Sequence, residues 1–374
     1  MNFTVAKSKA EPFARATPQA PVVPHIAGVG VAIPGQDIHQ AFIDWALSRL
    51  ADPRERKLFG RMAERAGIEH RWSVLEPSAD GAATDAAAFY AGERLPGTAR
   101  RMQAYATLAP KLALRAVADL AAKTRLGDVT HLVVASCTGF VAPGIDQVLA
   151  RELGLRDDLE RTLVGFMGCY AAVAALRTAA HIVRSEPRAR VLVVTVELSS
   201  LHLQEEDRLE PLLASLLFGD GAAAALVSAS PEGIGLTRFF SHAVPDSAGL
   251  IGWTVGDQGF AMHLSGEVPG RIAHALAQPE CRRQLLGGAE PGQFDAWAVH
   301  AGGRSVLDAV EVALGLAPEA LAASRAVLRD CGNMSSSTLM FILARYLEQG
   351  ARAGVALAFG PGLAAEGFHF RRSE

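Results

Sequence analysis

Apolar runs of strand length alternate with helix-spaced patterns along the chain, and this alternation predicts its fold class. His131–Ser136 and Ala189–Leu198 are nearly continuous apolar runs, as is the stretch that follows the turn in Leu216–Ala229. Such runs are typical of strands buried on both faces. Apolar residues at helical spacing fill Tyr105–Lys123, and the alanine-rich Tyr170–Val183 shows the same pattern. Strands alternating with helices predict a layered α/β fold.

The second part of the chain repeats this style. Asp295–Gly303 is expected to be a strand that ends in a glycine turn, and Ser335–Gln349 is expected to be a helix. Gly354–Gly362 is expected to be the last strand and turn. Strand–turn–helix units in both parts fit a fold of two similar halves.

Changes in composition indicate where these halves begin and end. Proline and alanine are frequent near the N-terminus, which predicts a loose tail over residues 1–22. The composition shifts again at Ser230–Gly233. We therefore place the N-terminal half at residues 23–231 and the C-terminal half at residues 232–374.

Composition and charge exclude several classes of protein. Half of the 374 residues are hydrophobic and 20% are charged, which excludes a disordered chain. The net charge is −3 without a long basic run, so nucleic acid is not an expected partner. No apolar run reaches the roughly 18 residues that a membrane-spanning helix needs. The four cysteines form no CxxC pair and we see no secretory signal, so we expect a cytoplasmic protein without disulfides or a zinc site.

Three polar residues stand at turns beside the expected strands and helices. Cys169 lies between a glycine turn and the alanine-rich helix, and a helix that began at this cysteine would stabilise its thiolate. His300 follows an apolar strand, and Asn333 precedes a serine-rich helix start. Taken singly, each also has a structural interpretation: a buried cysteine, a hydrogen-bonded core histidine and a helix N-cap.

Taken together, the three residues predict nucleophilic catalysis. Cys169, His300 and Asn333 could supply a nucleophile, a base and a neutral N–H donor for an enolate or alkoxide oxygen. A thiol protease would instead use the asparagine to orient the histidine. The aromatic-rich signature around a papain-type cysteine is missing from this chain, which argues against that alternative.

Five short motifs occur here in an order that resembles one known family. They are VGFMGCYAA, LFGDGAAA, VHAGG, GNMSSSTLMFIL and AFGPG, and the resemblance extends from about Arg61 to Gly362. The chain resembles the type III polyketide synthases, the chalcone synthase family of the thiolase superfamily. This resemblance implies a thiolase-like layered αβαβα fold with two similar halves. The nucleophile Cys169 would belong to the first half, and the catalytic His300 and Asn333 to the second.

The resemblance also implies a reaction. Cys169 would take an acyl starter from CoA, and His300 with Asn333 would stabilise the enolate that forms when malonyl-CoA loses CO₂. That carbanion would attack the Cys169 thioester, and further rounds would precede cyclisation. The acyl-CoA starter and malonyl-CoA are substrates, and no metal or redox cofactor is expected because loss of CO₂ drives the carbon–carbon bond.

Further positions that match the family assign the walls of this site. Phe218 matches the aromatic gatekeeper between the CoA tunnel and the cavity, and Gly302 and Gly303 match the turn along which pantetheine passes. The basic residues expected at the tunnel mouth are Lys57, Arg61 and Arg65. The residues expected in the cavity are Met262, Trp253, Cys137, Thr138, Ser199, His202 and Ser335.

Two departures from the plant pattern argue against chalcone as the product. Trp253 stands where chalcone synthase has a glycine, and Met262 stands where plant enzymes have a second gatekeeper phenylalanine. We expect Trp253 to fill the floor of the aryl pocket, which resembles bacterial members that convert fatty acyl starters to alkylpyrones or alkylresorcinols. The family is homodimeric, and the apolar excess of the chain agrees with a large buried contact.

Two other functions share parts of this pattern. An initiating ketoacyl-ACP synthase has the same fold and the same Cys-His-Asn set, but its histidine belongs to a His-Gln-Ala-Asn motif, whereas Ala-Gly-Gly follows His300 here. A non-catalytic partner subunit would keep the fold for interaction alone. The intact set of Cys169, His300 and Asn333 argues against that function.

Overall fold

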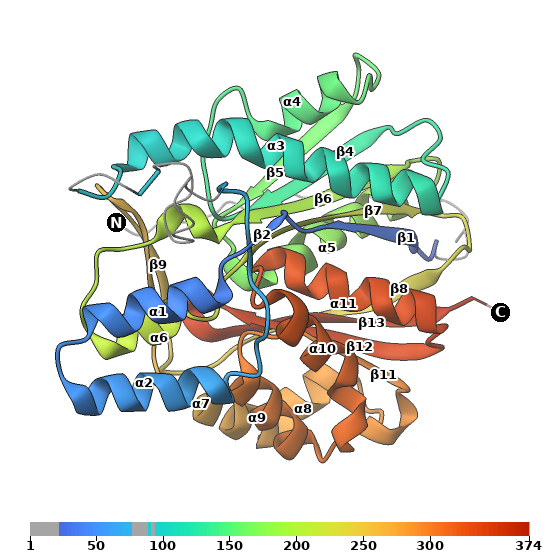
Figure 1. The fold of residues 1–374 in the computed structure, drawn as a ribbon. Coiled ribbons are helices and arrows are strands. Elements are labelled where there is room, and N and C mark those ends of the chain that lie inside the picture. The colour runs from blue at the N-terminus through green and yellow to red at the C-terminus, as the bar shows by residue number, and fades with distance from the viewer. Residues whose placement is uncertain (1–21, 77–88, 91–93, 374) are drawn as a thin grey trace, which may run out of the picture.

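A nine-stranded sheet runs through the protein, which we describe from a computed structural model over residues 22–76, 89–90 and 94–373 (Figure 1). In spatial order its strands are β11 (Ala296–Val299), β12 (Ala353–Gly360), β13 (Ala364–Arg372), β8 (Ile234–Ala243), β1 (His25–Ala32), β7 (Asp220–Ser228), β6 (Val191–Leu198), β4 (His131–Ser136) and β5 (Glu160–Gly165). Two short antiparallel pairs lie apart from it, β2 (Gln36–Asp37) with β3 (Trp72–Ser73), and β9 (Ile251–Gly256) with β10 (Gly259–Leu264). Apart from Val22, the predicted tail over residues 1–22 lies outside the described residues.

Four strands in each half of the sheet share one topology, and β5 is added at the edge of the first half. In the first half, β1 and β7 are antiparallel, β7 and β6 are antiparallel, and β6 and β4 are parallel. In the second half, β8 with β13, β13 with β12, and β12 with β11 repeat this order of antiparallel, antiparallel and parallel pairs. The halves join where His25 and Ile26 of β1 pair with Gly235 and Ile234 of β8. The predicted α/β fold of two similar halves is therefore confirmed.

Helices form three layers around these strands (Figure 1). Two central helices, α5 (Ala171–Ser185) and α11 (Ser336–Gln349), share one core with strands from both halves. The outer face of the first half carries α3 (Thr98–Lys123) and α4 (Ile145–Glu152), and that of the second half carries α7 (Val268–Ala277), α8 (Pro279–Leu286) and α9 (Arg304–Leu314). The remaining helices are α1 (His39–Arg49), α2 (Pro53–Arg65) and α6 (Leu209–Ser215), which pack together, and α10 (Ala322–Cys331) beside α11.

Each strand of the sheet interior contributes to two cores, which explains its continuous apolar sequence. In β4, Val133 and Ala135 belong to the central core, whereas Leu132 and Val134 pack under α3. Successive side chains of a strand point to opposite faces, so a strand between two helical layers needs apolar residues at every position. The apolar run at 131–136 therefore corresponds to β4 without a shift at either end.

Helix α11 is apolar or small on nearly every side over most of its length because it lies between two sheet surfaces. Every residue of α11 from Ser336 to Ala344 is buried, and Ser337 bonds Thr195 of β6 through their hydroxyls at 2.9 Å. In α5, five buried alanines allow the neighbouring strands to approach closely. A helix buried all round is expected only in the interior of a large fold.

Several elements differ from the sequence-based expectation. The strand predicted to be the last, β12, is followed by β13, which pairs with both β12 and β8. The pattern also gave no indication of β1, which contains Gly28 and Gly30. A Cβ atom at Gly30 would lie 2.2 Å from the backbone nitrogen of Leu120, so the glycine lets α3 cross directly over the strand.

Over the described ranges 22–76, 89–90 and 94–373, we find no helix with both the length and the apolar character needed to span a membrane.

Candidate active site

Cys169 lies at the end of a strained connection between β5 and α5. Phe166 and Gly168 have φ values of 55° and 68°, and a single 3-10 turn at Gly168–Tyr170 precedes α5. The cysteine is thus one turn before the helix rather than its first residue. A glycine next to the cysteine could make room for a substrate, but a Cβ at Gly168 would lie 2.2 Å from Cδ of Pro361. The glycine is needed instead because the turn after β12 packs against it.

His300 and Asn333 are brought to the same place by backbone pairing between distant segments. His300 follows β11, and its backbone N–H donates to the carbonyl of Leu357 in β12 at 2.8 Å. The backbone N–H of Asn333 donates to the carbonyl of Leu217 at 2.8 Å, and its carbonyl accepts from Gly219 at 3.0 Å. The LFGDG and CGNM turns are therefore joined, which fixes Phe218 beside Asn333.

The side chain of Asn333 is oriented by its neighbours. Its Nδ2 donates to the carbonyl of Gly302 at 3.3 Å, and its Oδ1 accepts from the backbone N–H of Ser335 at 2.9 Å. Ser335 has a φ of 48°, an unusual conformation for a serine. These contacts fix which end of the amide carries the donor.

One cavity of about 1200 Å³ is lined by half of the predicted site residues. Cys169, His300 and Asn333 all line it, although each comes from a different segment of the chain. Phe218, Met262, Gly302, Gly303 and Arg65 line it as well. Lys57 and Arg61 lie on the exposed side of α2 and line neither this cavity nor the one next to it.

Burial controls the electrostatics of the two reactive groups. Burial raises the pKa of the Cys169 thiol to about 12, although hydrogen bonds from Ser335 and Asn333 favour the thiolate. Burial lowers the pKa of His300 to about 3. Within the described residues, neither ring nitrogen of His300 has a hydrogen-bond partner. An ion pair with His300, which would lower the pKa of the Cys169 thiol, is therefore not formed in this structure.

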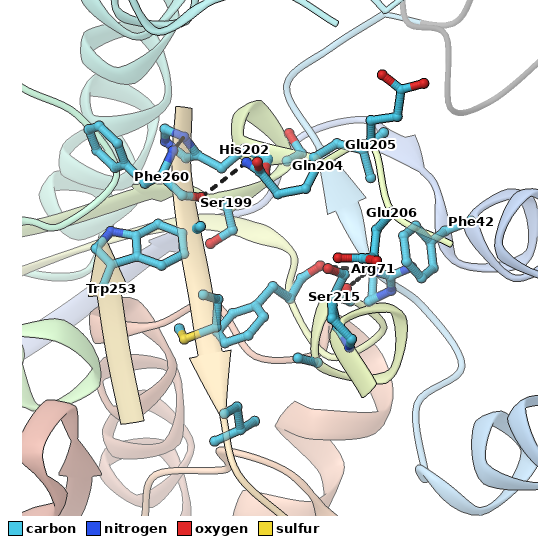
Figure 2. A pocket seen from close by; sticks show the side chains of 18 of the residues that line it. Phe42, Arg71, Ser199, His202, Gln204, Glu205, Glu206, Ser215, Trp253 and Phe260 are labelled. Carbon is cyan, nitrogen blue, oxygen red and sulfur yellow. Dashed lines mark hydrogen bonds between the residues drawn. The ribbon is translucent and has the colours of Figure 1, made fainter. Parts of the chain in front are cut away.

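A second cavity, drawn in Figure 2, has a volume of about 510 Å³. It adjoins the first and shares Phe218 and Met262 with it. Ser199, His202 and Trp253 line this second cavity. Trp253 on β9 is paired across the hairpin with Met262 on β10, so one hairpin supplies both residues. The shared wall places Phe218 between the two spaces, as expected of a gatekeeper.

His202 is a fixed, neutral part of this wall. Its Nε2 lies 2.7 Å from the carbonyl of Thr138, and its Nδ1 lies 3.0 Å from the backbone N–H of Phe260. Nε2 must therefore carry the proton, because Nδ1 accepts. Burial lowers the pKa of His202 to about 4, and the ring stacks on Phe260 with centroids 4.3 Å apart.

Cys137 and Thr138, which we predicted to line the cavity, lie behind its wall instead. The backbone N–H of Gly168 lies 2.9 Å from Sγ of Cys137, and the Cys137 carbonyl accepts a hydrogen bond from Nε1 of Trp253 at 2.8 Å. The Thr138 hydroxyl donates to Glu197 at 3.0 Å. Their side chains are committed to internal contacts, so they support the site rather than touch its contents.

Glu197 is a buried acid under the site that the sequence patterns did not single out. Its carboxylate accepts from the backbone N–H of Cys137 at 2.9 Å and from the hydroxyls of Thr138 and Ser336. Burial raises its pKa to about 7. A glutamate near the end of the apolar run VLVVTVEL was the available signal, because an acid in a fully buried strand needs dedicated partners.

The mouth of the larger cavity is more basic than the sequence suggested. Arg304, the residue after the two-glycine turn, lines this cavity together with Arg65 and Arg208. Nη1 of Arg304 lies 3.4 Å from the carbonyl of Arg65, so the start of α9 meets the end of α2 here. Arg208 is paired with Glu206 at 2.9 Å and Arg304 more loosely with Asp308 at 3.6 Å, whereas Arg65 has no ion pair among the described residues.

Comparisons with known proteins identify the family. Residues 19–231 match the family model of the N-terminal domain of chalcone and stilbene synthases, and residues 236–373 match that of the C-terminal domain. The chain is 33% identical over 373 residues to the alpha-pyrone synthesis polyketide synthase-like Pks18 of Mycobacterium tuberculosis, covering 94% of this chain and 93% of that protein. It is 36% identical over 293 residues to bisdemethoxycurcumin synthase of Oryza sativa, covering 72% and 73%.

Solved structures agree with this family. The C-terminal type III polyketide synthase domain of Steely1 from Dictyostelium superposes with a TM-score of 0.83 at 26% identity, covering 94% of this chain and 99% of that domain. The fungal type III polyketide synthase ORAS gives a TM-score of 0.82 at 28% identity, covering 94% and 100%. The chain belongs to the chalcone and stilbene synthase family and is a type III polyketide synthase, an acyltransferase that catalyses decarboxylative condensation.

Proposed function

We propose that Cys169 carries the growing chain and that His300 and Asn333 stabilise the enolate. The observation that supports this assignment is that all three line one cavity whose mouth holds Arg65 and Arg304. Cys169 attacks the starter thioester and releases CoA. Malonyl-CoA then loses CO₂, and the electron pair left on carbon is held as an enolate by N–H donors of Asn333 and His300. The enolate carbon attacks the Cys169 thioester, so the thiolate leaves and the extended chain is on CoA, from which Cys169 takes it up again with release of CoA for the next round.

We further propose that fatty acyl starters are extended to alkylpyrone or alkylresorcinol products. Trp253, held by its hydrogen bond to Cys137, occupies one end of the second cavity together with His202 and Phe260 (Figure 2). Three packed rings leave little room for a planar aryl group at that end, whereas a flexible chain can pass beside them. The name of the Mycobacterium relative, which refers to alpha-pyrone synthesis, supports the same product class.

Turnover of a panel of acyl-CoA starters with malonyl-CoA tests this proposal. We expect fatty acyl starters to be preferred over coumaroyl-CoA by at least about 10-fold in kcat/KM, the discrimination that a hydrophobic pocket can supply. Trp253→Gly should narrow this ratio by opening space for the aryl group. Products are identified by mass spectrometry. If coumaroyl-CoA were the only starter that the enzyme converts, that result would contradict the proposal.

We also propose that Arg65 and Arg304 bind the phosphates of CoA. Each guanidinium is exposed at the cavity mouth, where it can meet a phosphate with two parallel hydrogen bonds. Loss of one such bond, worth about 1.5 kcal/mol, corresponds to about a 10-fold change in affinity. Arg65→Ala and Arg304→Ala should therefore raise KM for malonyl-CoA about 10-fold with little change in kcat.

The matched control for these variants is Arg56→Ala, an exposed arginine of α2 that lines neither cavity. Arg61→Ala, measured alongside, shows whether the phosphate site extends along α2 as first expected. If KM is unchanged in both Arg65→Ala and Arg304→Ala, the phosphates bind elsewhere.

We propose that two chains associate through the edge of the sheet at β5. This strand is exposed along most of its length, and its Leu163 side chain is 47% exposed. Phe140, 48% exposed, stacks on Phe166 with ring centroids 4.8 Å apart just beyond the strand. An open edge with exposed apolar side chains favours pairing with a second copy.

Sedimentation equilibrium tests the dimer. We expect a mass twice that of the 39.4 kDa chain at micromolar concentration. Leu163→Lys should shift the population toward the single-chain mass because it places a charge in the contact. A single-chain mass for the unaltered protein would contradict this association.

A further inference from the structure

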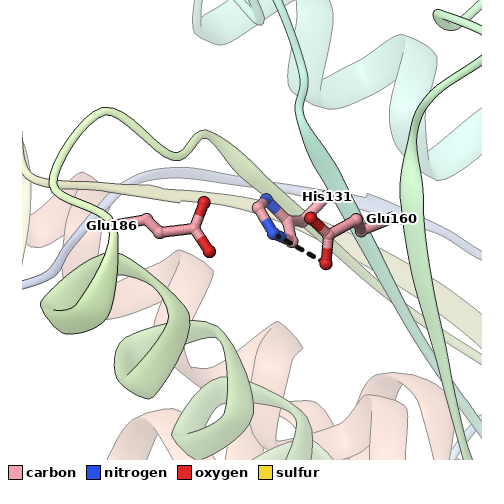
Figure 3. A group of neighbouring side chains, drawn as sticks. All are labelled: His131, Glu160 and Glu186. Carbon is pink, nitrogen blue, oxygen red and sulfur yellow. Dashed lines mark ion pairs between the residues drawn. The ribbon is translucent and has the colours of Figure 1, made fainter.

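A cluster of three potential metal ligands lies outside the cavities, at the end of β5 remote from Phe166. His131 and Glu160 are register partners at the first positions of the parallel strands β4 and β5, and Glu186 caps the C-terminus of α5. One ligand atom from each residue lies within 4.8 Å of the others. Figure 3 shows the three side chains directed toward a common point from two strands and one helix end.

The imidazole of His131 is buried and oriented toward the cluster. The residue is only 5% exposed, and its Nδ1 lies 2.8 Å from the hydroxyl of Thr130. That hydroxyl also contacts the carbonyl of Arg190 at 3.3 Å, so it can donate there and accept the Nδ1 proton. Nε2, 3.6 Å from a Glu160 oxygen, then presents a lone pair to the cluster. An outer hydrogen bond of this kind is what orients metal-binding histidines.

Both carboxylates of the cluster are exposed and have few ion-pair partners. Among the ion pairs of the described part of the chain, Glu160 pairs only with His131, and Glu186 has none. Glu186 also stands at the C-terminus of a helix of 15 residues, where the negative end of the helix dipole disfavours a carboxylate and favours a cation. A divalent ion would neutralise both carboxylates and the helix end.

We propose that His131, Glu160 and Glu186 form a binding site for a divalent transition metal, of which Zn²⁺ is the natural probe. One imidazole and two carboxylates are ligands that Zn²⁺ accepts, with water in the fourth position. Zinc ligands lie at about 2.0–2.2 Å, and rotations of the two exposed glutamate side chains close the remaining gap. The ion would tie the starts of β4 and β5 to the end of α5, away from Cys169.

Calorimetric titration of the tag-free, chelator-treated full chain with zinc chloride tests the site. We expect one Zn²⁺ per chain at micromolar zinc. Glu186→Gln and Glu160→Gln should each weaken binding at least about 10-fold, and Thr130→Val should weaken it by about 10-fold through loss of the outer hydrogen bond. These changes are at the surface or nearly isosteric, so the variants should keep the fold. His131→Ala is not used because it could disturb packing. The exposed carboxylate Glu280, replaced by glutamine, serves as the control.

Cobalt binding distinguishes this site from the cysteines. Co²⁺ bound to thiolate gives an intense charge-transfer band, which a nitrogen and oxygen site lacks. We expect a spectrum without that band, unchanged after alkylation of the thiols. Absence of saturable zinc binding at micromolar concentration, or equal binding by the Glu160→Gln/Glu186→Gln double variant, would overturn the proposal. Polyketide synthesis is not the readout, so the result is independent of the proposed starter and product.

Discussion

Replacing Cys169 with glutamine is expected to abolish chain extension while leaving decarboxylation of malonyl-CoA measurable. The thioester cannot form without the thiol, and loss of a catalytic nucleophile costs at least about 10³-fold in turnover. His300 and Asn333, which we propose to stabilise the enolate, come from the position just after β11 and from the turn before α11. They remain in place in the variant, so malonyl-CoA can still lose CO₂ and yield acetyl-CoA. Glutamine fits because Cys169 faces a cavity of about 1200 Å³.

Both reactions are followed in one assay by mass spectrometry of acetyl-CoA and of polyketide products. Cys281→Ala is the matched control, because Cys281 is also buried but belongs to the outer core around α8. This control should retain extension. If the Cys169→Gln variant still elongates a starter, the nucleophile is a different residue.

Replacing His300 with alanine is expected to make Cys169 much less reactive near neutral pH. Burial keeps each group neutral when it is alone, since it raises the pKa of the thiol to about 12 and lowers that of the imidazole to about 3. Transfer of the thiol proton to His300 would place an imidazolium beside a thiolate, and each charge would then offset the burial penalty of the other. The two nitrogens of His300, unpartnered in the described structure, are available for this pairing.

The pairing is measured as the rate of inactivation by iodoacetamide against pH. In the unaltered enzyme we expect an apparent pKa below the ordinary thiol value of about 8.5. Without His300 the thiolate loses its partner, so the apparent pKa should rise and alkylation at pH 7 should fall by at least about 10-fold, one pKa unit or more. Identical profiles for the two proteins would remove the ion pair from the mechanism. Cys281→Ala again controls for reaction at other thiols.

Local sequence signals were sufficient for the residues whose environment is built by their own segment. Strand β4 was predictable because burial on both faces demands an unbroken apolar run. Cys169 could be proposed as a nucleophile because a glycine turn precedes it and an alanine-rich helix follows it. The strand β1 was missed because Gly28 and Gly30 dilute its pattern. Those glycines are required by α3, which lies about 90 residues further along the chain and crosses above them.

Which side chains line the site depends on contacts between distant segments, and no local sequence pattern predicts these contacts. Cys137 and Thr138 match cavity positions in sequence, yet their side chains are drawn inward by Gly168 and Glu197. Arg304 reaches the cavity mouth only because α9 begins against the end of α2. The cluster at His131 has no spacing typical of a metal motif, since its members come from two strands and a helix end.

The sequence by itself determined the layered α/β class and the family motifs, and it indicated Cys169, His300 and Asn333 as the candidate catalytic residues, because each depends on residue types within a short window. The tertiary structure alone decided that these three share one cavity, that the resting Cys169 and His300 are unpaired, and which arginines face the entrance. The physical reason is that distances between distant segments, and the burial that shifts their pKa values, are set by how the two halves of the sheet pack around α5 and α11.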